Sequence, residues 1–280
     1  MSRPDAPPRI AILDMYAGAP NQGLRCLQEL LGAPRAQGAA GSVVDTFPTR
    51  AKGAVPDLSY DAYFSTGGPG SPFEGEGEPW EAAYFEFLDR LFEHNRRATG
   101  GRKHLLAICY SFELMCRRLD LARVTPRRSP SFGVMPIHLT PDGKDDPLLA
   151  GLPDPFYAVD NRDWQVVQPN RAAIARLGAR VIALEKIRPH VPLERAVTAM
   201  RVSAEVAGVQ FHPEAEPSSL LAYFRRPELR RDIVSHHGEE KYADLLAKVE
   251  DPDLLARTYR TVIPNFLRGA LAARDAADPR

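Results

Sequence analysis

The chain has 280 residues, long enough to bury a sizeable core, and its 36 Lys plus Arg balance 36 Asp plus Glu. This balance excludes an overall field that would draw the protein to nucleic acid or to an acidic membrane surface. The three cysteines, Cys26, Cys109 and Cys116, show no CxxC metal spacing, so we expect no metal, no cofactor and a reducing, cytoplasmic setting. The N-terminus lacks an apolar signal core, and no apolar run is long enough to span a bilayer, which predicts a soluble protein.

The first half of the chain alternates between strand-like and helix-like segments. Four apolar runs have the composition of strands: 9–14, 42–47, 60–65 and 104–108. Helical apolar spacing occupies 22–31 and 80–95. This alternation predicts βαβ units, a mainly parallel sheet and helices on both of its faces. Functional groups should then gather at the carboxyl ends of the strands.

In the second half of the chain, strand-like segments no longer alternate with helical ones. Short strand-like runs follow one another at 134–139, 156–159, 180–184, 196–201 and 207–211, which predicts a small antiparallel patch added to the sheet. Helical spacing returns at 219–224, 239–249 and 253–273. We therefore expect a main α/β domain over residues 1–216 and a helical C-terminal extension over 217–280 that packs on it.

Cys109 stands where an apolar strand ends and a helix-capable segment begins, with the small residues Ala107 and Ser111 two positions to either side. This is the pattern of a nucleophile elbow, in which small neighbours let a helix and a strand pack closely. The N-terminus of a helix also favours a negative charge, so the Cys109 thiol should ionise more readily than a free cysteine. The alternative is a buried core cysteine at the end of a strand.

His212 and Glu214 lie two residues apart after the strand 207–211, which places both side chains on the same side of the chain. A histidine oriented by a carboxylate is the base that an activated thiol needs: His212 would accept the thiol proton and later protonate the leaving group. Glu214 would fix the imidazole tautomer. Taken alone, the pair fits a solvated surface feature better than a catalytic one.

The loop 66–72 (TGGPGSP) is richer in glycine than a simple turn requires. Its backbone N–H groups could form half of an oxyanion hole, and the N–H of Tyr110, just after the candidate nucleophile, the other half. A phosphate cradle is the rival interpretation, although the Gly-Lys-Ser/Thr ending of a P-loop is missing. An ordinary Gly/Pro loop is the third.

Together, the segments 67–72 (GGPGSP), 108–110 (ICY) and 208–214 (GVQFHPE) resemble the class I glutamine amidotransferases in order and separation. Segments 132–133 and 146–153 also look like the amidotransferase portion of GMP synthase and its stand-alone relatives. The resemblance covers about residues 9–216 and implies a flavodoxin-like fold, a Cys109–His212–Glu214 triad and a γ-glutamyl thioester. It further implies oxyanion donors at the N–H groups of Gly68 and Tyr110, with Gly70 near the substrate.

Several positions depart from the family pattern. The family usually shows Gly-x-Cys-x-Gly around the nucleophile, whereas this chain has Ala107 and Ser111. Four residues past the nucleophile the family usually carries a substrate-holding glutamine, and here the residue is Glu113. A carboxylate at this position would oppose thiolate formation and would recognise a different partner group. The Ser-His segment of the family is not evident in residues 160–164.

The sequence therefore predicts a cysteine-dependent amidohydrolase that cleaves the side-chain amide of glutamine or a γ-glutamyl compound and releases ammonia. The chain has no P-loop, so the ammonia would pass to a separate synthetase subunit or be released. The alternative is a catalytically inactive binding or regulatory module with the same fold. The C-terminal helices could cover the active site, form a homodimer face or dock a synthetase.

Overall fold

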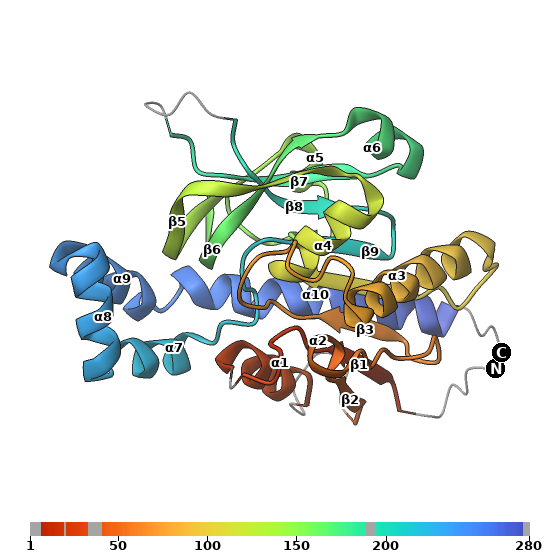
Figure 1. The fold of residues 1–280 in the computed structure, drawn as a ribbon, viewed down its shortest axis with the longest axis horizontal. Helices are drawn as coiled ribbons and strands as arrows, with labels where there is room; N and C mark the ends of the chain where they lie inside the picture. Colours follow the sequence, from red (N-terminus) through yellow and green to blue (C-terminus); the bar gives the residue numbers. More distant parts are fainter. Residues whose placement is uncertain (1–6, 20, 33–40, 189–193, 277–280) are drawn as a thin grey trace.

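The computed structural model describes residues 7–19, 21–32, 41–188 and 194–276 and arranges them as one sheet between helices (Figure 1). The sheet has nine strands in the order β2-β1-β3-β4-β9-β8-β6-β5-β7. The strands are β1 (Arg9–Leu13), β2 (Val43–Phe47), β3 (Ala62–Ser65), β4 (His104–Ile108), β5 (Ala122–Leu139), β6 (Phe156–Pro169), β7 (Arg180–Glu185), β8 (Val197–Arg201) and β9 (Val206–Val209). The helices are α1 (Gln22–Gly32), α2 (Thr49–Lys52), α3 (Pro79–Arg97), α4 (Tyr110–Leu119), α5 (Pro141–Lys144), α6 (Arg171–Leu177), α7 (Pro217–Phe224), α8 (Pro227–His237), α9 (Glu239–Glu250) and α10 (Leu254–Ala276).

Five neighbouring strands form the parallel part of the sheet. β1 pairs in parallel with β2 and β3, β3 with β4, and β4 with β9. The order β2-β1-β3-β4-β9 follows the doubly wound pattern in which ligands bind beyond the carboxyl ends of the strands. The segments after β3, β4 and β9 contain the Gly-rich loop, Cys109 and His212, so this topology brings the three sequence motifs to one edge.

The antiparallel part is much larger than the small patch expected from the sequence. β8 pairs antiparallel with β9 and β7, and β5 pairs antiparallel with β6 and β7. β5 has 18 residues and β6 has 14, so the two longest strands both belong to this part. The expectation of a mainly parallel sheet was therefore wrong: the sheet is mixed, with four strands in the antiparallel part.

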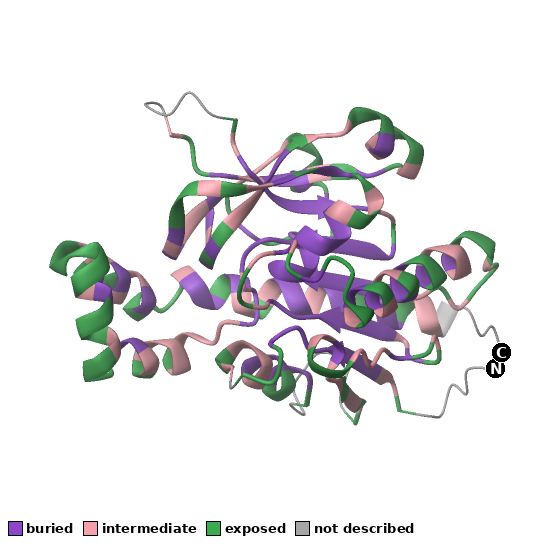
Figure 2. Cartoon of the chain, in the orientation of Figure 1, coloured by how far each residue is buried: buried purple, intermediate pink, exposed green. Residues whose placement is uncertain are grey.

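The core lies on both faces of the sheet, because successive residues of a strand point to opposite sides. Ile10 and Ile12 of β1 join one buried cluster with residues of α1 and α10, whereas Ala11 and Leu13 join a second cluster with residues of α3 and α4. Figure 2 shows the central strands and most of α4 buried, whereas α1 and α3 have exposed outer sides. The parallel strands are thus covered on both faces, which positions their carboxyl ends rigidly.

The C-terminal helices pack in two different places. In α10, Phe266 contacts Phe64 of β3 edge to face at 5.1 Å between ring centroids, so this helix completes the core of the sheet. The helices α7 to α9 instead form a third buried cluster with the hairpin of β5 and β6, in which Val134 and Leu245 are buried. The boundary at residue 216 between a main domain and an extension stays a prediction.

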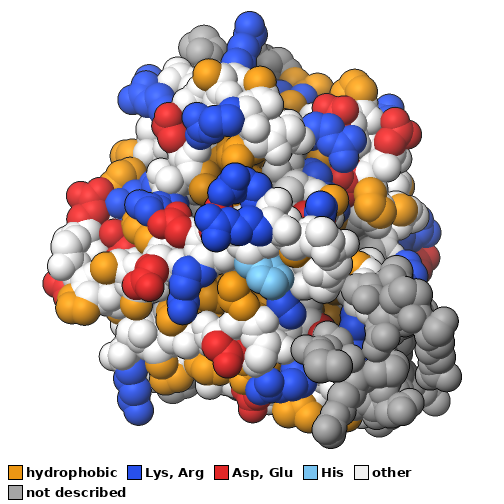
Figure 3. Space-filling model, turned by 90° about the vertical axis from the view of Figure 1, so that its right-hand side faces the viewer, with side chains coloured by type: hydrophobic (Ala, Val, Ile, Leu, Met, Phe, Trp, Pro, Cys, Tyr) orange, Lys and Arg blue, Asp and Glu red, His pale blue; other side chains and the backbone are white. Residues whose placement is uncertain are grey.

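The surface carries charges of both signs. Figure 3 shows Lys and Arg side chains interspersed with Asp and Glu on one face of the molecule, in keeping with the formal net charge of zero. None of the helices in the described part of the chain is long and apolar enough to cross a membrane.

Candidate active site

Cys109 lies between β4 and α4 with φ 50° and ψ −107°, a conformation that L-residues adopt rarely and that marks a strained turn. The turn is tight because α4 approaches β9 closely: a Cβ on Gly208 would lie 2.2 Å from Cδ2 of Phe112. The Ser111 hydroxyl donates to the carbonyl of Thr66 at 2.5 Å, so this departure from the family pattern is accommodated by a buried hydrogen bond. The elbow geometry expected from the sequence is present.

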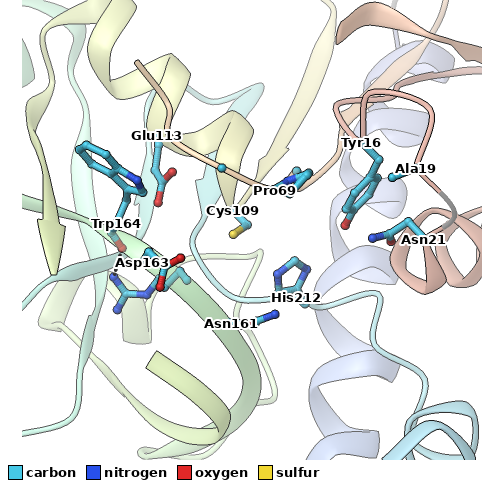
Figure 4. Close-up of a pocket in the computed structure, with 13 residues that line it drawn as sticks. Tyr16, Ala19, Asn21, Pro69, Cys109, Glu113, Asn161, Asp163, Trp164 and His212 are labelled. Carbon is cyan, nitrogen blue, oxygen red and sulfur yellow. Dashed lines mark hydrogen bonds between the residues drawn. The ribbon is translucent and has the colours of Figure 1, made fainter. Parts of the chain in front are cut away.

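The side chains of Cys109, His212 and Glu214 lie together at this edge of the sheet. Nδ1 of His212 is 2.8 Å from Oε1 of Glu214, and the imidazole lies beside the Cys109 side chain (Figure 4). The backbone N–H of His212 donates to the carbonyl of Val159 in β6 at 2.9 Å, which fixes the loop after β9. The imidazole is thus held between a carboxylate and a thiol, as the His-x-Glu spacing predicts.

The electrostatics of this group act on both ends of the proposed proton transfer. The pKa of the Cys109 thiol lies above its usual value because burial outweighs the opposing charge of His212, so the expectation that this thiol ionises more readily than a free cysteine is not met. Burial alone would lower the pKa of His212, but the charges of Glu214 and Cys109 raise that pKa well above its usual value. The Glu214 carboxylate therefore strengthens the imidazole as a base.

The Gly-rich loop after β3 packs too closely for side chains. A Cβ on Gly68 would lie 2.4 Å from the carbonyl oxygen of Met15, and Gly70 has φ +88°. The loop is held by Arg50, whose Nη1 donates to the carbonyl of Pro69 at 2.6 Å and to that of Met15 at 3.2 Å. No sequence pattern pointed to Arg50, because a single arginine in a short helix carries no local signal for such a role.

Glu113 points from the first turn of α4 into the same region and is 3% exposed. Its Oε1 accepts a hydrogen bond of 2.9 Å from Nε2 of Gln210, and the same nitrogen lies 3.8 Å from Sγ of Cys109. Gln210 belongs to the 208–214 motif, but the sequence pattern gave no sign of this contact. Glu113 is therefore a buried group beside the thiol.

The β6 segment 160–164 forms one wall of the site around a buried arginine. Nε of Arg162 donates to both carboxylate oxygens of Asp160, at 2.9 and 3.0 Å, and Nη2 lies 3.5 Å from Oε2 of Glu185. Nη1 of Arg162 donates to the carbonyl of Trp164 at 3.0 Å. The sequence did not point to this wall, because the Asp160–Arg162 spacing carries no specific signal and the pair with Glu185 joins two different strands.

A cavity of about 390 Å³ connects these elements (Figure 4). It is lined by Tyr16, Ala19, Asn21, Gly68, Pro69, Gly70, Cys109, Glu113, Asn161, Arg162, Asp163, Trp164 and His212. In Figure 4, Glu113, Asp163 and Trp164 lie on one side of the thiol. Tyr16, Ala19 and Asn21 lie on the opposite side, beyond His212. Cys109 thus stands at the middle of an elongated pocket.

We expect the carboxyl of Glu113 to make stability fall as the pH rises. Burial raises the pKa of Glu113 to about 7, although the hydrogen bond from Gln210 opposes the shift. Because the folded chain then binds the proton more tightly than the unfolded chain, this contribution is fully present below the unfolded pKa and lost as the pH rises through the folded one. Between pH 5 and 8, the unfolding free energy of the wild-type protein should fall by about 2–3 kcal/mol more than that of Glu113→Gln. Urea unfolding at both pH values measures the difference.

The control for this measurement is Glu86→Gln, which removes an exposed carboxylate from the solvent face of α3. It should reproduce the pH dependence of the wild-type protein. If Glu113→Gln also follows the wild-type curve, the buried carboxyl is not the source of the effect.

Comparisons with known proteins agree with this architecture. The family model for class I glutamine amidotransferases matches residues 35–225, more than half of the chain. The fold is similar to that of a glutamine amidotransferase from Thermotoga maritima, with 15% identity, a TM-score of 0.66 and coverage of 95% of this chain and 99% of that one. No curated protein matches the sequence.

Two further structures share the fold. A putative GMP synthase component from Thermoplasma acidophilum has 14% identity, a TM-score of 0.57 and coverage of 97% of this chain and 98% of that one. The glutaminase domain of a Trypanosoma brucei CTPS, solved with bound acivicin, has 12% identity, a TM-score of 0.57 and coverage of 95% of this chain and 94% of that one. The chain belongs to the class I glutamine amidotransferase family.

The described residues contain no group of three or more His, Cys, Asp or Glu side chains placed to hold a metal ion.

Proposed function

We propose that the protein is a cysteine-dependent amidohydrolase that cleaves the side-chain amide of glutamine or of a γ-glutamyl compound. The observation that carries this proposal is the arrangement of Cys109 at a strained elbow, beside a His212 that is in turn held by Glu214. A positioned thiol, base and orienting carboxylate are the parts that nucleophilic acyl transfer requires. Membership of the class I family supports glutamine as the parent substrate.

In the first half of the reaction, His212 accepts the thiol proton and Sγ of Cys109 attacks the amide carbon. The N–H groups of Gly68 and Tyr110 would stabilise the oxyanion; as the first residue of α4, Tyr110 has an N–H without an acceptor inside the helix. The imidazolium then protonates the departing nitrogen, which leaves as ammonia. Glu113 and Gly70 would contact the acyl part of the substrate.

In the second half, water attacks the thioester carbon while His212 accepts a proton from it. The carbon–sulfur bond breaks, the imidazolium returns its proton to sulfur, and the acid product leaves. Glu214 stabilises the imidazolium in both halves through its hydrogen bond to Nδ1. The ammonia would be released or passed to a separate synthetase subunit; the similarity to a structure described as part of a GMP synthase supports the second fate.

Labelling with a glutamine-derived diazoketone tests the proposal. Mass spectrometry should find one adduct, on Cys109, and none on Cys26 or Cys116, which are buried away from the cavity lining. A coupled assay should also detect ammonia or amine release from a panel of γ-glutamyl amides. Absence of both labelling and release would favour the alternative of a non-catalytic binding module.

A further inference from the structure

The pocket is divided by the catalytic geometry proposed above into an acyl side and a leaving-group side. Because Nδ1 of His212 bonds to Glu214, Nε2 is the nitrogen that faces the thiol and must reach the departing nitrogen. The departing nitrogen therefore lies on the His212 side of Cys109, and the acyl chain extends the other way, toward Glu113 and Trp164 (Figure 4).

The leaving-group side does not end at the imidazole. A Cβ on Gly67 would lie 2.9 Å from Cε1 of His212 and 3.1 Å from the hydroxyl oxygen of Tyr16, so the phenol adjoins the imidazole. Beyond it, Ala19 and Asn21 continue the cavity wall. Ammonia is a single heavy atom and fills none of this space, whereas the total of about 390 Å³ falls within the range that holds ligands much larger than one amino acid.

The residues that line this side are neutral, and the charge behind them is negative. Tyr16, Ala19, Asn21 and Pro69 carry no formal charge, and burial together with the nearby carboxylate of Glu214 raises the pKa of Tyr16 well above its usual value, so the phenol stays protonated. Arg50 is engaged by the carbonyl of Pro69 and by Glu74 and does not line the cavity. This side suits an uncharged alkyl or hydroxyalkyl group better than an amino acid with a free carboxylate.

We propose that the preferred substrates are secondary γ-glutamyl amides, whose small neutral N-substituent occupies the pocket formed by Tyr16, Ala19 and Asn21. This inference rests on the proposed function and specifies its substrate class. The bond broken is the one between the γ-carbonyl carbon and the substituted nitrogen; that nitrogen takes its proton from His212 and leaves as a primary amine. Water then releases glutamate from the Cys109 thioester.

The test compares kcat/KM for glutamine with that for its N-methyl, N-ethyl and N-propyl amides, measured by glutamate release. The values should rise along the series by about three- to fourfold for each carbon that is buried. Ala19→Phe fills the pocket and should lower the ratio of kcat/KM for the N-propyl amide to that for glutamine by at least about tenfold. Ala82→Phe, on the exposed face of α3, should keep the wild-type ratio.

A flat or falling series with glutamine still hydrolysed would overturn this inference and leave the proposed function standing. A rising series whose ratio is unchanged by Ala19→Phe would overturn the placement of the substituent. If glutamate is released neither from glutamine nor from any of its N-alkyl amides, both the inference and the proposed function are overturned.

Discussion

Replacing Cys109 with alanine should lower kcat for glutamine or γ-glutamyl amide hydrolysis by about 10⁴-fold or more, because no other group can form the thioester. The residual rate would come from the oxyanion donors and from substrate binding alone. Glutamate release at saturating substrate measures the effect. The same variant should lose labelling by the diazoketone, because the adduct forms on the sulfur of Cys109.

The control is Cys26→Ala, because Cys26 is also a buried free cysteine but lies in α1 outside the cavity lining. It should keep the activity and the labelling of the wild-type protein. The circular dichroism spectrum of Cys109→Ala should match the wild type, since alanine fits the volume of the elbow. Activity of Cys109→Ala within tenfold of wild type would contradict the proposed nucleophile.

Replacing Arg162 with methionine should lower the free energy of unfolding by about 3–5 kcal/mol, because the variant leaves the buried carboxylate of Asp160 without a counter-charge. The Arg162 side chain is 2% exposed and pairs with Asp160 and with Glu185, and Glu185 also has Arg127 and Arg188 as partners. Removing one partner of a buried charge network costs far more than the net contribution of the intact network. Urea unfolding at pH 7.5 measures the change.

An exposed ion pair provides the matched control. Arg118 pairs with Asp89 on the surface, and its side chain is 42% exposed, so Arg118→Met should cost no more than about 1 kcal/mol. The same small cost for Arg162→Met would show that Asp160 and Glu185 are neutral or solvated without the arginine.

The features that could be predicted from the sequence are local ones, each determined by residues that lie close together in the chain. The elbow at Cys109 depends on a strand, one nucleophile and small neighbours within a few residues, and the structure contains it. The approach of the Gly-rich loop to Cys109 followed from the rule that parallel strands present their carboxyl ends at one edge, whereas the pairing with His212 was implied by the family resemblance. These inferences needed no knowledge of how distant segments pair.

The lengths of β5 and β6 were not predictable in this way. The first half of β5, residues 122–130, contains Arg127, Arg128 and two prolines, and this composition is typical of a loop. It is a strand because it pairs with β6, and the pairing shifts register between Pro126 and Ser131, where the irregular residues lie. Nη1 of Arg127 itself lies 3.1 Å from Oε2 of Glu185, so this side chain is not on a solvated face.

Glu113 shows a further limit of sequence reasoning. Its exposure depends on Gln210 and on the β6 wall, neither of which is near it in the chain. The sequence shows that Glu113 departs from the family pattern. Only the structure shows that its carboxyl is buried and accepts a hydrogen bond from Gln210, 97 positions away.

The strand order has a consequence for how the chain is made. β4 pairs with β3 on one side and with β9 on the other, and β9 begins only at Val206. While the ribosome is synthesising the intervening residues, the nascent chain can pair β1 to β4 but leaves β4 with an open edge, which is a template for association with other chains. The helix α10, which covers one face of these strands, is synthesised later still. The sheet can therefore be closed and covered only after both β9 and α10 have left the ribosome.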